Sequence, residues 1–170
     1  MKGYYFISTW KYLLRVFLLS FILFVLTVQK TKAQEPPPVI DATVNQSLGF
    51  GAFTTSPTTG SVTILSDGTR TTNNVVGLFG FPYSNAIFKV ATNKPALLSI
   101  VKGPDVLLTR SGGDSMTLQI GDPNPPSPFL VPHPPGYVLV NIGGTLLVGD
   151  TGANPPGNYN GTFDLTFIWE

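Results

Sequence analysis

The 170-residue chain contains no cysteine. This absence excludes a disulfide scaffold, a thiolate zinc site and a cysteine nucleophile. Histidine is almost absent too, because His133 is the only one and it lies among prolines. Neither a cysteine nor a second histidine accompanies it as a metal ligand, so we interpret His133 as a solvated loop residue.

Charge is scarce as well, since only 11% of the residues are charged. The net charge of +1 hides an asymmetry, because five of the ten basic residues precede Gln34. From Gln34 onward five basic residues stand against nine acidic ones, which gives this part a net charge of −4. A mildly acidic body argues against nucleic acid or an anionic lipid surface as a partner.

Catalytic motifs are missing in the same way. The chain has no phosphate-binding loop, no dinucleotide glycine fingerprint and no nucleophile elbow. Its acidic residues occur singly, and most of them neighbour Gly, Pro or Asn, where aspartate caps turns with its own side chain. A hydrolase with two paired carboxylates is therefore the least favoured hypothesis. We predict that the protein is not an enzyme and has no catalytic residues and no cofactor.

Two loops supply oxygen atoms that Ca²⁺ could use, namely Asp122-Pro123-Asn124 and residues 150–154. Neither has the spacing of an EF-hand loop. Loops rich in Asp and Asn are usually only turns. We therefore predict no metal site.

The first 33 residues are typical of a secretory signal peptide. Basic residues precede an apolar run from Val16 to Val28, and Ala33 offers a small residue for cleavage before Gln34. The alternative is an uncleaved anchor, but this run is short compared with the about 20 residues of a membrane span. We predict export to the periplasm, the cell surface or the medium, with no membrane segment after cleavage.

Residues 34–38 contain three prolines and form a short, stiff spacer. The remainder, 39–170, has short alternating apolar segments separated by Gly, Pro and Asn turns, and no stretch shows a helical apolar face. Regularly spaced short strands with turn signals indicate a single all-β domain, an immunoglobulin-like antiparallel β-sandwich. The segments expected as strands are 39–45, 48–53, 61–66, 69–76, 86–92, 96–101, 106–109, 115–120 and 137–142.

The end of the chain carries the clearest strand pattern. Residues 143–148 and 163–169 alternate on either side of a Gly/Pro/Asn turn region, which predicts a hairpin-like pair. In the second segment one face carries the apolar residues Phe163, Leu165, Phe167 and Trp169. We expect this face to close the core of the sandwich.

The segment from Asp122 to Pro135 contains seven prolines. Proline removes a backbone donor and is excluded from the centre of a sheet. The sequence therefore predicts a long Pro-rich loop over 122–135, with Phe129, Leu130 and Val131 as its apolar tip.

Four blocks together resemble a known family. They are QSLGFGAFTT at 46–55, GSVTILSDGTRTT at 60–72, the turn at 111–113, and GGTLLVG followed by NPPGNYNGTFDLTF from residue 143. Their order resembles domain of unknown function 4402, which occurs in exported proteins of Gram-negative bacteria. The family is similar to spore-coat-U-like and fimbrial-subunit domains, which are immunoglobulin-like sandwiches. The resemblance implies an exported sandwich and supplies no catalytic residue.

Two functions fit these features. The first is a non-enzymatic, exported structural or fimbria-like surface-assembly domain, whose partners are other copies of itself or other surface proteins. The alternative is an adhesin-like module that binds carbohydrate or protein, with aromatics that could stack on sugar: Tyr83, Phe129, Tyr137 and Tyr159. A long, open apolar edge would favour assembly, and a concave aromatic-lined patch would favour binding.

Overall fold

The computed structural model describes residues 10, 12–21 and 34–170. The chain divides into two units, Met1–Pro36 and Pro37–Glu170. In the first unit, residues 12–21 are helical. Among the described residues, no helix combines the length and the apolarity that are needed to cross a membrane. Ala33 of the expected cleavage site lies outside the described residues, and Gln34 is the first residue of the last described range.

The second unit consists of antiparallel strands. They are β1 (Ile40–Gln46), β2 (Phe53–Thr54), β3 (Gly60–Ile64), β4 (Arg70–Asn73), β5 (Val76–Gly77), β6 (Ala86–Thr92), β7 (Ala96–Lys102), β8 (Val106–Thr109), β9 (Ser115–Asn124), β10 (Phe129–Val131), β11 (Tyr137–Val148) and β12 (Leu165–Trp169). A seven-stranded sheet contains β1, β6, β11, β3, β4, β9 and β8, and a smaller sheet has the order β10-β7-β12. The predicted all-β sandwich is confirmed.

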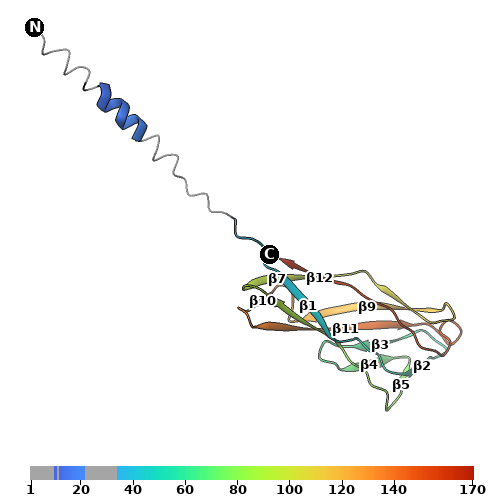
Figure 1. The fold of residues 1–170 in the computed structure, drawn as a ribbon. Coiled ribbons are helices and arrows are strands. Elements are labelled where there is room, and N and C mark those ends of the chain that lie inside the picture. Colours follow the sequence, from blue (N-terminus) through green and yellow to red (C-terminus); the bar gives the residue numbers. More distant parts are fainter. Residues whose placement is uncertain (1–9, 11, 22–33) are drawn as a thin grey trace, which may run out of the picture. The chain divides into compact units, whose positions relative to one another are not determined.

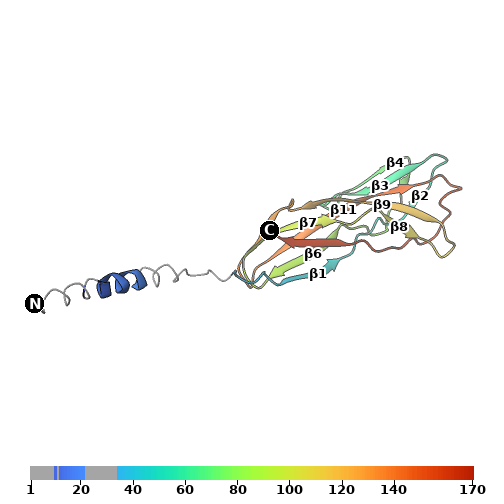
Figure 2. The ribbon, with the colours of Figure 1, turned by 90° about the horizontal axis from the view of Figure 1, so that it is seen from above.

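The long strand β11 holds the large sheet together. On one side its first half pairs with β6 and its second half with β3, while β9 pairs along the other side. Figures 1 and 2 show the consequence, with β7 and β12 toward one end of this unit and β2, β3 and β4 toward the other. Alternate residues of β11 point inward along its whole length: Val138 is partly buried, and Val140, Ile142, Leu146 and Val148 are buried. One strand therefore supplies both ends of the core.

The two halves of β11 meet at a pair of buried glycines, Gly143 and Gly144. A Cβ atom on Gly143 would lie 1.9 Å from the backbone oxygen of Ile64 on β3. No side chain can occupy that position, because real Cβ atoms do not approach a backbone oxygen so closely. Glycine is therefore required where β11 leaves β6 and joins β3.

The small sheet packs on β6 and the first half of β11. A core cluster of Val90, Leu98, Val131, Val140 and their neighbours fills the space between the layers. Two edge-to-face aromatic contacts join Phe88 of β6 to Phe163 and to Phe167 of β12, and a third joins Phe167 to Phe129 within the small sheet. Edge-to-face pairs of this kind stabilise a core beyond the area that they bury.

The predicted hairpin between 143–148 and 163–169 is wrong. β12 pairs with β7 in the small sheet, with Phe167 opposite Ile100. The second half of β11 already has β3 and β9 as neighbours, so it offers no free edge to β12. The expected face is right for Phe163, Leu165 and Phe167, which pack on the core, whereas Trp169 at the end of the strand is 41% exposed.

The predicted Pro-rich loop over 122–135 is also wrong in part. β9 continues to Asn124, and residues 129–131 form β10, which pairs with β7. Phe129 and Val131 are buried, while Leu130 between them is 64% exposed. The physical reason is that β10 contains no proline and lies at an edge, where a strand needs backbone partners on only one side.

At the other end of the large sheet, the residues that the structure describes form no regular second layer. Its core cluster includes Val62, Ile64, Met116, Leu118 and Leu146. Side chains of irregular segments cover it, among them Phe50, Val75 and Tyr159. The expected strand over 48–53 is wrong except at its last residue, because Gly51 has a φ of 69° and interrupts the extended chain.

Candidate functional site

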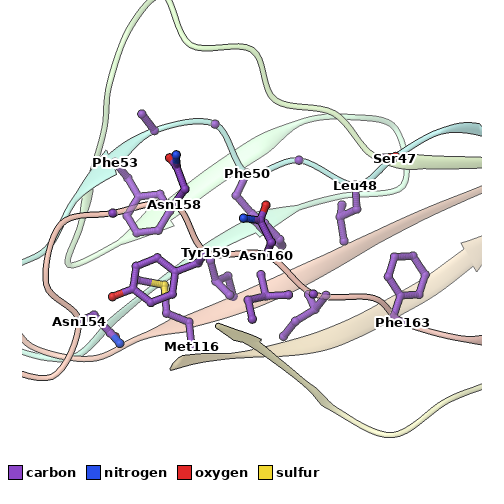
Figure 3. Close-up of a pocket in the computed structure, with 18 of the residues that line it drawn as sticks. Ser47, Leu48, Phe50, Phe53, Met116, Asn154, Asn158, Tyr159, Asn160 and Phe163 are labelled. Carbon is purple, nitrogen blue, oxygen red and sulfur yellow. The ribbon is translucent and has the colours of Figure 1, made fainter. Parts of the chain in front are cut away.

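A pocket with a cavity volume of about 830 Å³ lies over this loosely covered end of the large sheet. It lies between two segments, residues 44–55 and residues 154–163, and we call it the neutral pocket. Figure 3 shows the first segment carrying Leu48, Phe50 and Phe53, and the second carrying Asn158, Tyr159 and Asn160. Its volume falls within the range of about 300–1,000 Å³ that is usual for ligand sites.

The floor of the neutral pocket is the core of the sheet. Leu108 of β8, Met116 and Leu118 of β9, and Leu146 of β11 line it, and each of them is buried. The pocket is therefore a place where the second layer is incomplete. A ligand there would bury apolar surface against residues that already belong to the hydrophobic core, which is the main source of binding free energy for an apolar group.

The lining carries no formal charge. Among the described residues that form the neutral pocket, none is Asp, Glu, Lys, Arg or His. The polar groups at its rim are amides and hydroxyls, such as Gln46, Asn158 and Asn160. Burying an unpaired charge in such a site would be costly. The lining is therefore better suited to uncharged groups than to charged ones.

The segment 154–163 is held in place by its own side chains. Asn154 is buried, donates a hydrogen bond of 2.8 Å from Nδ2 to the carbonyl oxygen of Ser115, and accepts one from the backbone N–H of Gly149. The Tyr159 hydroxyl donates to the carbonyl oxygen of Pro155 at 2.8 Å. This wall of the pocket is therefore fixed before any ligand arrives.

The opposite wall is fixed from behind. Gly49 and Ser84 exchange two backbone hydrogen bonds of 2.8 and 2.9 Å. The Arg70 guanidinium donates to the carbonyl oxygen of Phe50 at 3.2 Å and to that of Leu78 at 3.3 Å. Arg70 thereby ties this wall to the connection that follows β5.

Each wall is held to a neighbouring segment by a pair of backbone hydrogen bonds on its outer side. Asn160 exchanges two backbone hydrogen bonds with Thr109 of β8, as Gly49 does with Ser84. The pocket is therefore a slot between two anchored walls.

The candidate residues from the sequence lie elsewhere. His133 is exposed, and its Nδ1 lies 2.9 Å from the carbonyl oxygen of Pro134. In the part of the chain that the structure describes, no group of three His, Asp or Glu side chains could hold a metal ion. The calcium candidate Asp150 instead accepts hydrogen bonds from the backbone of Gly152 and Ala153, at 2.9 and 2.8 Å. This confirms the predicted turn role of that aspartate.

Three charged groups have shifted pKa values, and none of them lines the pocket. The backbone N–H of Thr69 lowers the pKa of the Asp67 carboxyl by hydrogen bonding. A hydrogen bond from Lys102 lowers the pKa of Asp122, the other calcium candidate. A hydrogen bond to Asp114 raises the pKa of Arg110. These shifts describe surface turns and ion pairs.

The four aromatics proposed for sugar stacking are not brought together. Phe129 is buried in the core. Tyr83 lies under the Arg70 guanidinium and Tyr137 under the Lys89 ammonium, each cation 4.5 Å from the ring centroid. Only Tyr159 lines the neutral pocket.

Sequence analysis did not find the pocket, although a signal was present. Residues 42–66 and 151–163 contain no charged residue at all, and both include apolar residues among Gly, Pro and Asn. An exposed turn usually carries charge, whereas a wall around an apolar cavity does not. Most of both walls lies within these two uncharged stretches.

These two walls also lie within the blocks that resemble a known family. The model of the family described as Domain of unknown function (DUF4402) matches residues 40–169. The chain belongs to this family. The match covers all twelve strands of the sandwich and both walls of the pocket. No curated protein and no solved structure matches the chain.

Proposed function

We propose that this member of the family is an exported, non-enzymatic binding domain of a bacterial surface, and that its neutral pocket holds an uncharged apolar segment of a partner protein. The observation that carries the proposal is the pocket itself, a slot over an apolar floor with no charged lining residue. Export rests on the signal-like pattern of residues 1–33.

A protein segment fits this slot for two reasons. The floor consists of aliphatic side chains and Met116, which suit apolar side chains rather than the polar faces of a sugar. The rim carries the uncharged amides of Gln46, Asn158 and Asn160, which offer donors and acceptors to the backbone of a bound segment.

Carbohydrate is the second candidate. It is favoured by Tyr159 and by the amides of Asn158 and Asn160, which together offer a ring face and hydrogen-bonding groups at the rim. A single available ring makes a small stacking platform, however, and the Tyr159 hydroxyl already donates to Pro155. The role in structural or surface assembly is contained in the first proposal, because capture of a partner protein is itself an assembly step.

Substitution of Asn160 by Trp tests the binding site. Asn160 lines the pocket and is exposed to solvent. An indole at this position should therefore fill the slot without disturbing the core. We expect the wild-type chain to bind a subset of an array of capped, uncharged eight-residue peptides. The Asn160→Trp chain should lose at least about tenfold in affinity, which equals about 1.4 kcal/mol.

The matched control is Asn73→Trp, an exposed asparagine on β4 that does not line the pocket. It should bind the same peptides as the wild type. An array of neutral oligosaccharides measured in parallel separates the two candidate ligands. Equal binding by all three proteins would place the binding surface outside the pocket and would refute the proposal.

Binding should also be independent of pH between about 5 and 8. Histidine is the side chain that normally titrates in this range, and His133 does not line the pocket. The lowered pKa values of Asp67 and Asp122 lie below the window, so both carboxyls stay ionised across it. Their contribution to stability is lost only as the pH falls through those lowered values. A peptide titration at three pH values checks this, and a change above about threefold would contradict a neutral site.

A further inference from the structure

The most exposed apolar feature of the second unit is the connection between β5 and the bridge at Ser84. We call residues 78–83 the Phe79 loop. Phe79 is fully exposed at 102%, Phe81 is 53% exposed and Leu78 is 37% exposed. Figure 1 shows the connection after β5 projecting beyond the neighbouring strands. Large apolar side chains gathered at a projecting tip usually mark an interaction site.

The loop is built to project. The Arg70 guanidinium donates a hydrogen bond to the carbonyl oxygen of Leu78 and lies 4.5 Å from the centre of the Tyr83 ring. The backbone N–H of Leu78 also donates to the carbonyl oxygen of Ala52 at 2.9 Å. Both ends of the loop are therefore anchored, and Phe79 and Phe81 remain outside. A preorganised tip loses little conformational entropy when it binds.

The loop and the neutral pocket match in chemistry. No charged residue occurs between Arg70 and Lys89, so the loop and its surroundings in the sequence are neutral. The pocket lining is neutral as well, and its floor is apolar. The side chains of Phe79 and Phe81 together are no larger than the ligands that a cavity of about 830 Å³ holds.

The loop cannot enter the pocket of its own chain. The wall that carries Gly49 and Ala52 stands between them, because its backbone pairs with Ser84 and Leu78 while its residues line the pocket. We infer that the Phe79 loop of one copy seats in the neutral pocket of a second copy. This inference rests on the proposed function and names the partner of that site.

The contact should be weak. An aromatic side chain buries about 150–250 Å², so Phe79 and Phe81 together would bury about 300–500 Å² of surface. This is less than the about 800 Å² per partner of a standard interface. The Phe79 loop and the neutral pocket lie on different surfaces of one chain. Each copy can therefore bind one neighbour through its pocket and another through its loop. Such a contact favours reversible assembly at high local concentration, as on a cell surface.

The absence of cysteine from the chain allows a direct test. Two full-length chains with tags of different size are mixed and oxidised, one carrying Leu78→Cys and the other Asn160→Cys. A disulfide requires Cβ atoms about 3.5–4.5 Å apart, so its yield reports the contact. We expect a mixed covalent dimer, with a yield about tenfold above that of Leu78→Cys mixed with Leu147→Cys, an exposed control on β11.

A second substitution in the loop gives the matched variant. Phe79→Asp, added to the Leu78→Cys chain, would place a charge in the neutral pocket and should lower the mixed-dimer yield about tenfold. Because Phe79 is fully exposed, this variant should keep the wild-type melting temperature. All variants share the same N-terminal unit, so association through that unit would raise every yield equally.

The outcomes separate the two proposals. Yields that do not differ between Asn160→Cys and Leu147→Cys would overturn the inference. If capped peptides still bind the wild type and not Asn160→Trp, the proposed function survives that result. Phosphatidylcholine vesicles that bind the chain less after Phe79→Asp, without a mixed dimer, would assign the loop to a membrane surface and also overturn the inference.

Discussion

Replacement of Gly143 by Ala is expected to destabilise the domain by at least about 3 kcal/mol, the upper end of what overpacking of a core usually costs. The added Cβ would lie 1.9 Å from the backbone oxygen of Ile64 and 2.7 Å from the carbonyl carbon of Leu65. Backbone atoms cannot move aside as a flexible side chain can. β3 and β11 would have to separate, and five residue pairs between Gly144–Ile64 and Val148–Gly60 depend on that contact.

The separation would also reach the neutral pocket, because Leu146 of β11 forms part of its floor. Urea unfolding of Gly143→Ala measures the loss. The control is Gly152→Ala, where the nearest atom to a new Cβ is an Asp150 oxygen at an ordinary 3.4 Å. That change should stay within about 0.5 kcal/mol of the wild type. Similar midpoints for the two variants would show that β3 and β11 do not approach as closely as described.

The need for Gly143 illustrates what the sequence could and could not predict. Alternation along 137–142 and again along 143–148 predicts two strands. Continuity through two glycines is not predicted, because glycine is typical of turns and bulges. Only the approach of β3 shows why a strand contains glycine at this point. Local pattern predicts which residues alternate, and tertiary contact decides where a strand ends.

Strand pairing failed for a related reason. The period of two in 163–169 correctly predicted that Phe163, Leu165 and Phe167 face the core. It carried no information about the neighbouring strand, since any strand with a free edge can accept β12. β7 has that free edge, and β12 pairs with it. This pairing depends on how the two sheets pack and not on the local pattern of residues 163–169. Nearest-neighbour hairpins are the commonest solution, and here the chain crosses to the other sheet.

The candidate site was beyond sequence reasoning for a third reason. Its floor comes from β8, β9 and β11, and its walls from segments about a hundred residues apart in the chain. Each wall looks like an ordinary turn-rich loop. The family resemblance rests on four blocks, two of which contain most of these walls, and it is confirmed over 40–169. It identifies the stretches that matter without indicating that they meet around a cavity.

The segment 122–135 contributes two buried residues to the core, Phe129 and Val131, although its prolines predict a surface loop. Replacement of Phe129 by Ala is expected to cost about 3–5 kcal/mol, the usual range for a buried aromatic residue. Phe129 is 6% exposed and meets Phe167 edge to face, with ring centroids 6.4 Å apart. Its loss would leave a cavity in the core beneath the small sheet and remove the aromatic contact between β10 and β12.

Leu130→Ala is the matched control, since Leu130 is the next residue of the same strand and is 64% exposed. It should cost less than about 1 kcal/mol, because an exposed side chain loses little contact. Both free energies follow from urea unfolding of the full-length chain. If 122–135 were a surface loop, the two variants would melt together near the wild type. A difference of several kcal/mol instead shows that a strand flanked by prolines completes the small sheet, because only Phe129 and Val131 face inward.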